Sequence, residues 1–125
     1  MLKRLLLVAA LGAIGTLARY GLSSLVLKFR GPGFPWGTLA VNGVGCFLFG
    51  LVWSLAESRQ TLTSETRLIL LIGFMGAFTT FSTFAFETAE MMRKTQYLAA
   101  GGNIAAQVAG GIALLFLGFA VGKVA

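Results

Sequence analysis

The stretch from Gly73 to Phe84 gathers three kinds of residue that a segment built only to be apolar would not need. It holds two glycines, four phenylalanines and four hydroxyl side chains within five residues. Hydroxyls donate hydrogen bonds, and the edge of an aromatic ring is electropositive because of its quadrupole. Such groups could replace the water around a small anion in a narrow place. The side chains concerned are Phe74, Phe78, Phe81 and Phe84, with Thr79, Thr80, Ser82 and Thr83.

The composition of the chain around this stretch is that of a membrane protein. Of its 125 residues, 57% are hydrophobic and 11% are charged, whereas soluble domains carry about 25% charged residues. The mean hydropathy is +0.86. The net charge of +6 could suggest nucleic acid, but the basic residues stand in ones and twos at the ends of apolar runs, as in membrane proteins. We therefore expect a lipid bilayer around the chain and no nucleic-acid partner.

Few groups are available for enzymatic chemistry. The chain has no histidine, which removes the usual general base and the commonest metal ligand. Its single cysteine, Cys46, excludes an intramolecular disulfide and a cysteine-based metal site. Only four carboxylates are present. An enzyme is therefore not expected.

Apolar runs separated by short polar turns predict four membrane-spanning helices in one domain, residues 1–125. A helix needs about 20 residues to cross a hydrocarbon core of about 30 Å. Trp36 and Trp53 fit interfacial anchors of the second span, and Thr63 with Ser64 and Glu65 offers a cap for the third. The chain is thus predicted to be an all-α membrane protein. We expect the spans at about residues 3–27, 36–57, 66–92 and 97–122.

The loop charges predict weakly determined orientation in the membrane. Four spans put five basic residues on one side, namely Lys3, Arg4, Arg59, Arg67 and Lys123, and four on the other, namely Lys28, Arg30, Arg93 and Lys94. The positive-inside rule needs an excess on one side. This balance is consistent with subunits that insert both ways; the alternative is a single topology with weak signals. A chain of 13.2 kDa also has little interior, so a pathway more plausibly involves a dimer.

The third span is predicted to break near its middle. Gly73, Gly76 and the β-branched threonines at 79, 80 and 83 weaken a helix, and a broken membrane helix leaves backbone groups that can coordinate ions. The alternative is an unbroken helix with a phenylalanine-rich packing face, whose hydroxyls bond to its own carbonyls. The residues alone leave both open.

Polar side chains in the other spans are costly in lipid and are usually functional. Arg19 could reach the interface, pair with a carboxylate such as Glu87, or attract an anion. Asn42 offers two N–H donors and a carbonyl, either to a ligand or to another helix. Asn103 and Gln107 are four residues apart on one helix face, where they could line a path or join helices.

Three motifs in order decide between these alternatives, because together they resemble the signatures of the bacterial fluoride channel family, Fluc/CrcB. The resemblance covers essentially the whole chain. It implies an antiparallel, dual-topology homodimer in the bacterial inner (plasma) membrane, with two pores that conduct fluoride passively out of the cell and protect against its toxicity. The motifs are Gly12-x-x-Gly15-x-x-x-Arg19-Tyr20, Pro35-x-Gly37-Thr38-Leu39-x-Val41-Asn42-x-x-Gly45 and Gly73-x-x-Gly76-x-x-Thr79-Thr80-Phe81-Ser82-Thr83-Phe84-x-x-Glu87.

The resemblance also implies roles for single residues. Phe81 and Phe84 would form a phenylalanine box, and the fluoride path would include Asn42. A structural sodium ion at the dimer centre would bind the backbone carbonyls of Gly76 and Thr79. The remaining assignments are Ser82, Thr83 and Thr38 on the fluoride path, Arg19 and Glu87 as structural or electrostatic groups, and Asn103 and Gln107 as candidate pore lining.

A second function class fits the size of the chain. Small multidrug-resistance transporters also have four spans and dual insertion, and they exchange protons for cationic compounds. Such exchange needs a membrane-embedded carboxylate, typically in the first span. Here the first span offers Arg19 instead, and Glu87 is the only candidate, at the edge of its span. A purely structural subunit would not explain why donors and rings gather at one depth.

Overall fold

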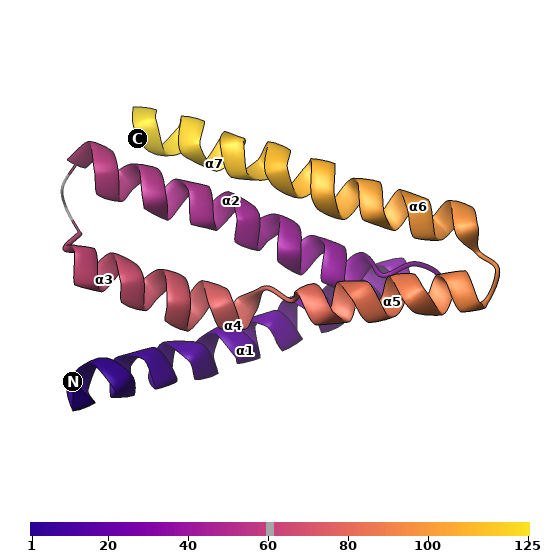
Figure 1. Ribbon diagram of the computed structural model, residues 1–125, viewed down its shortest axis with the longest axis horizontal. Coiled ribbons are helices and arrows are strands. Elements are labelled where there is room, and N and C mark those ends of the chain that lie inside the picture. Colours follow the sequence, from indigo (N-terminus) through magenta and orange to yellow (C-terminus); the bar gives the residue numbers. More distant parts are fainter. Residues whose placement is uncertain (60–61) are drawn as a thin grey trace.

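The computed structural model of the chain describes residues 1–59 and 62–125, and all regular elements within them are helical. Four helical segments are long and apolar enough to cross a membrane, which confirms the predicted class and the four spans. Both termini and the start of the third span lie at the same end of the bundle (Figure 1). The spans are Leu2–Arg30, Trp36–Glu57, Ser64–Arg93 and Tyr97–Val124.

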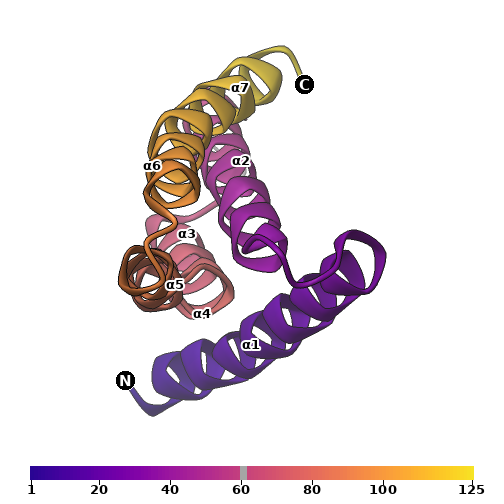
Figure 2. The same cartoon turned by 90° about the vertical axis from the view of Figure 1, so that its right-hand side faces the viewer.

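The first two spans are each a single helix. Helix α1 (Leu2–Arg30) ends at Gly31, whose φ of 75° lies in the left-handed region that favours glycine. Helix α2 (Trp36–Arg59) follows after a short turn. Viewed along the bundle, α2 lies between α1 and α7, the last helix (Gly111–Val124), and it packs against both (Figure 2).

The third and fourth spans are irregular. The third consists of α3 (Ser64–Ile69), η1 (Leu70–Met75), α4 (Gly76–Phe78) and α5 (Phe81–Arg93), and the fourth consists of α6 (Tyr97–Ala105), η2 (Ala106–Gly110) and α7. The predicted cap is present, because Thr63 accepts a hydrogen bond from Thr66 N at 3.1 Å. Segments η1 and η2 are π-helical turns, which the residue pattern did not predict. Such turns are frequent at functional sites.

Close backbone approach holds α2 against α7. A Cβ placed on Gly118 would overlap the carbonyl oxygen of Phe47, and a Cβ on Gly50 would overlap that of Leu115. Because lipid tails are as apolar as leucine, membrane helices associate through such close packing rather than through a hydrophobic driving force. These glycines therefore set the distance between two walls of the site described below.

Each tryptophan of α2 carries an arginine on its ring. The Arg30 guanidinium lies 5.0 Å from the centre of Trp36, and that of Arg67 lies 4.5 Å from the centre of Trp53. Cation–π contacts of this kind favour a ring at the polar boundary of the membrane. The two pairs lie near opposite ends of α2, where the sequence predicts interfacial anchors.

Candidate functional site

The third span breaks at Thr79 and Thr80, near its middle. Helix α4 ends at Phe78, and both threonines have extended backbone, with φ/ψ of −82°/160° and −149°/112°. Helix α5 then starts with Thr80 as its N-cap, whose hydroxyl accepts a hydrogen bond from Thr83 N at 3.2 Å. Gly73 and Gly76 themselves lie in helical turns. The threonines, which can cap a new helix, mark the break more closely than the glycines do.

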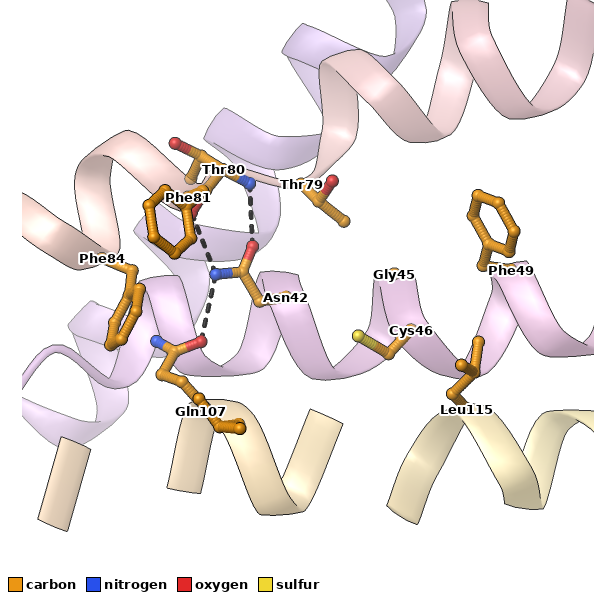
Figure 3. Close-up of a pocket in the computed structure, with 11 residues that line it drawn as sticks. Asn42, Gly45, Cys46, Phe49, Thr79, Thr80, Phe81, Phe84, Gln107 and Leu115 are labelled. Atoms are coloured by element: carbon orange, nitrogen blue, oxygen red, sulfur yellow. Dashed lines mark hydrogen bonds between the residues drawn. The ribbon is translucent and has the colours of Figure 1, made fainter. Parts of the chain in front are cut away.

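Asn42 of α2 stabilises the break by hydrogen-bonding both the backbone N–H and the backbone C=O of Thr80. Its Oδ1 accepts a hydrogen bond from Thr80 N at 2.8 Å, and its Nδ2 donates to Thr80 O at 3.0 Å (Figure 3). Nδ2 also donates to Oε1 of Gln107 at 3.0 Å. Both amide hydrogens of Asn42 are therefore engaged with protein groups.

The break takes the usual helical donors away from several backbone carbonyls, among them those of Gly76 and Thr79. In an unbroken helix Gly76 O would accept from Thr80 N, and Thr79 O would accept from Thr83 N. Thr80 N donates to Asn42 instead, and Thr83 N donates to the Thr80 hydroxyl. Groups of three or more His, Cys, Asp or Glu that could hold a metal are absent from the residues searched, 1–59 and 62–125. A cation here would depend on carbonyl oxygens.

Two phenylalanines at the start of α5 face each other edge to face. The ring centres of Phe81 and Phe84 are 5.5 Å apart at an interplanar angle of 66°. Phe84 is buried, with 9% of its surface exposed, whereas Phe81 is 78% exposed. They line a cavity of about 450 Å³ between α2, the break and the fourth span (Figure 3). Its other lining residues are Asn42, Gly45, Cys46, Phe49, Thr79, Thr80, Gln107, Val108 and Leu115.

The hydroxyls beside the rings divide into two groups. Thr79 Oγ1 donates to Met75 O, one turn earlier in the same span, at 3.0 Å. The alternative of an unbroken helix with a packing face predicted such a bond for all four hydroxyls. Ser82 and Thr83 instead face the Thr80 hydroxyl, with oxygen separations of 3.3 and 2.9 Å. This second group forms a hydroxyl cluster, exposed on the surface of the chain, at the start of α5.

Glu87 lies in the middle of α5 and is bound to α2. Its Oε1 accepts a hydrogen bond from the Thr38 hydroxyl at 2.8 Å, while Oε2 is buried without a partner among residues 1–59 and 62–125. Over the same residues Arg19 forms no ion pair with it, since the salt bridge found there joins Arg93 and Glu90. Arg19 is half-buried on α1. Thr38, rather than Arg19, is the partner of this carboxylate.

The structure separates the two polar residues of the fourth span. Asn103 is fully buried and donates to Thr88 Oγ1 at 2.9 Å. Thr88 in turn donates to Phe84 O at 2.8 Å, so Asn103 braces the turn that carries Phe84. Gln107 lines the cavity and bonds Asn42. The π-turn η2 starts between them, which gives each residue its own neighbour.

A comparison with protein-family models matches nearly the whole chain. Residues 6–119 match the family model described as CrcB-like protein, Camphor Resistance (CrcB). The chain belongs to the CrcB family. This confirms the resemblance that the three motifs carry.

Relatives in the CrcB family match the chain from end to end. A protein of Nitrosococcus oceani named fluoride-specific ion channel FluC is 51% identical over 124 residues, which is 99% of each chain. Proteins of the same name from Solidesulfovibrio magneticus and Nitratidesulfovibrio vulgaris are 53% and 46% identical, over 98% of each chain. The chain is similar to each of them along its whole length.

Several residues of the site in this CrcB-family chain were not expected from the sequence. Gly45 faces the break so closely that a Cβ there would overlap the Thr79 methyl group. Phe49 and Leu115 close the cavity on the side away from Phe84 (Figure 3). Gly45 stands in the second motif, so its spacing from Asn42 (three residues, one turn of α2) could have indicated it. Phe49 and Leu115 carry no such signal.

Proposed function

We propose that this chain is a fluoride-selective channel that lets fluoride leave the cell passively. One observation carries the proposal. In a chain of the CrcB family, whose relatives are named fluoride-specific ion channels, a cavity at a helix break is lined by two edge-to-face phenylalanines beside the amide side chains of Asn42 and Gln107.

Selectivity for fluoride would follow from the kind of groups that line this path. Fluoride is small and must lose water to enter a narrow place, so fixed donors have to replace the lost hydrogen bonds. The hydroxyls of Ser82 and Thr83 would serve that purpose along α5, and the electropositive edges of Phe81 and Phe84 would favour an anion. Thr38 of α2 would border the same path while its hydroxyl donates to Glu87. The residues that line the cavity carry no charged side chain, so selectivity would rest on these neutral groups.

An antiparallel homodimer would complete two such paths. The cavity opens along α5, where Phe81 is 78% exposed in the single chain. A second copy placed against this side would enclose the ring, and an inverted copy would use the same surface twice. The near balance of basic residues between the two faces suits insertion both ways. The expected location is the bacterial inner membrane.

A structural sodium ion would fit the break. The carbonyls of Gly76 and Thr79 have lost their helical donors to Asn42 and Thr80, and carbonyl oxygens are ligands for such hard cations. When bound, sodium would supply positive charge that offsets these two dipoles. Asn42 keeps the Gly76 carbonyl available because it occupies the Thr80 amide, and the Thr80 hydroxyl keeps the Thr79 carbonyl available because it occupies the Thr83 amide.

Flux from liposomes tests the function and its alternative together. We expect purified protein to release fluoride under an imposed gradient and to retain chloride. A small multidrug-resistance-like exporter would instead drive a quaternary ammonium compound against a proton gradient. Transport of the ammonium without fluoride efflux would replace the channel by this alternative. Absence of both fluxes in protein that elutes as a single folded species would end the channel proposal.

A further inference from the structure

The backbone of Thr80 determines how the Asn42 amide is turned. Oxygen and nitrogen of an amide side chain are assigned from their hydrogen-bond partners. Thr80 N can only donate and Thr80 O can only accept, so Asn42 must point Oδ1 at the first and Nδ2 at the second. The opposite orientation would set donor against donor and acceptor against acceptor.

The orientation of Asn42 determines that of Gln107 in turn. The second hydrogen on Asn42 Nδ2 needs an acceptor, and it meets Oε1 of Gln107 at 3.0 Å. Gln107 therefore turns its NH₂ group away from Asn42. A backbone peptide in the third span thus orients a side chain in the fourth span through one amide of α2.

The hydrogen bonds that link Thr80, Asn42 and Gln107 leave the NH₂ group of Gln107 without an acceptor among residues 1–59 and 62–125. Its Nε2 is buried and has no hydrogen-bond partner among residues 1–59 and 62–125. Gln107 lines the same cavity as Phe81 and Phe84, and its nitrogen points to the side where the Phe84 ring lies (Figure 3). A buried N–H without a partner costs about 1–3 kcal/mol, which an anion in the cavity would recover.

We propose that Gln107 Nε2 is the side-chain amide that donates to the anion beside Phe84, and that Asn42 is a positioning residue that aims it. The inference rests on the proposed function, since fluoride is the anion considered. Asn42 has no amide hydrogen left to offer, because both are bound to Thr80 O and Gln107 Oε1. Gln107 has two, fixed in direction before the anion arrives.

Two substitutions of Gln107 distinguish a role as hydrogen-bond donor to the anion from a role limited to linking α2 and the fourth span. Gln107→Glu keeps an oxygen for Asn42 Nδ2 and so preserves the link between α2 and the fourth span, but it removes the N–H donors. Gln107→Met removes link and donors without adding charge. Gln96→Met is the matched control, because Gln96 lies exposed at the start of α6.

We expect both Gln107 variants to lose fluoride efflux from liposomes by at least about tenfold, the size of one hydrogen bond to a charged group. Gln96→Met should match wild type. In detergent, fluoride should raise the unfolding temperature of wild type but not of either Gln107 variant, because a ligand stabilises only the state that binds it.

Asn42→Asp tests the relay. The introduced carboxylate still accepts from Thr80 N but can donate neither to Thr80 O nor to Gln107 Oε1. Gln107 would therefore turn its NH₂ group to that carboxylate and away from the cavity. We expect a loss of efflux similar to that of Gln107→Met, and no further loss in the double variant. Additive losses would show that Asn42 acts by itself. Normal efflux in either Gln107 variant, with a working wild type, would overturn the inference and leave the channel function intact; an inactive wild type would instead overturn the function.

Discussion

Replacing Gly45 with alanine would put a methyl group against the broken turn of the third span. The new Cβ would overlap Cγ2 of Thr79 and lie 3.4 Å from Cδ1 of Phe78. Thr79 cannot turn away freely, because its hydroxyl is bound to Met75 O at 3.0 Å. Either that hydrogen bond breaks, or α2 and the break move apart and strain the contact between Asn42 and Thr80.

The expected cost follows from these two routes. Extra methylene groups in a packed interior cost about 1–3 kcal/mol, and a lost hydrogen bond costs about 0.5–1.5 kcal/mol. A change of one or two kcal/mol already alters the folded-to-unfolded ratio by a factor of about 5–30. We therefore expect Gly45→Ala to lower stability by about 1–3 kcal/mol and to slow fluoride efflux by displacing Thr80.

Gly43→Ala on the same helix is the matched control. Its Cβ would lie 3.0 Å from Cδ1 of Leu114, a flexible methyl that can turn away, so the cost should be much smaller. Denaturant titration in detergent micelles and efflux from liposomes measure both variants side by side. If Gly45→Ala unfolds and conducts like Gly43→Ala, the contact between α2 and the break does not control the site.

Three further predictions use the same assays. Phe81→Ile and Phe84→Ile should both impair fluoride efflux because the ring edges are lost, and Phe84→Ile, whose side chain is buried within the chain, should also lower stability, by about 1 kcal/mol; normal efflux in both would refute the aromatic argument. Thr38→Val should destabilise by about 1–3 kcal/mol, because it removes the donor to Oε1 of Glu87, whose Oε2 already lacks a partner among residues 1–59 and 62–125; unchanged denaturant titration would contradict it. Gly118→Ala should cost at least about 1–3 kcal/mol, because its Cβ meets a backbone carbonyl of α2 that no rotamer change can move; a wild-type midpoint would count against the packing described for α2 and α7.

Hydropathy and capping chemistry were enough to predict the four spans and the start of the third. Long apolar runs can satisfy their backbone in lipid only as helices, and Thr63 caps α3 as its type suggests. The weakened region of the third span was also predicted, since glycine and threonine lower helix propensity over several residues. Which peptide breaks was not, because that depends on a partner in α2.

The polar side chains show where sequence reasoning ends. Asn42 could be picked out as costly in lipid, but its partner is a backbone group 38 residues away. Asn103 and Gln107 share a face in a regular helix, whereas the π-turn at Ala106 shifts that register and the two bind different spans. Tertiary contacts of this kind leave no periodic signal in the chain.

The pairing of Asn42 with Thr80 has the form of a bridge in an antiparallel sheet, where one residue exchanges both N–H···O bonds with the residue opposite. Here a side-chain amide takes the place of the facing strand. Two extended residues can therefore exist within the membrane because α2 supplies a single strand-like unit at their depth. The break therefore depends on both helices. Without Asn42 beside it, the third span would satisfy its backbone groups in lipid by forming a continuous helix.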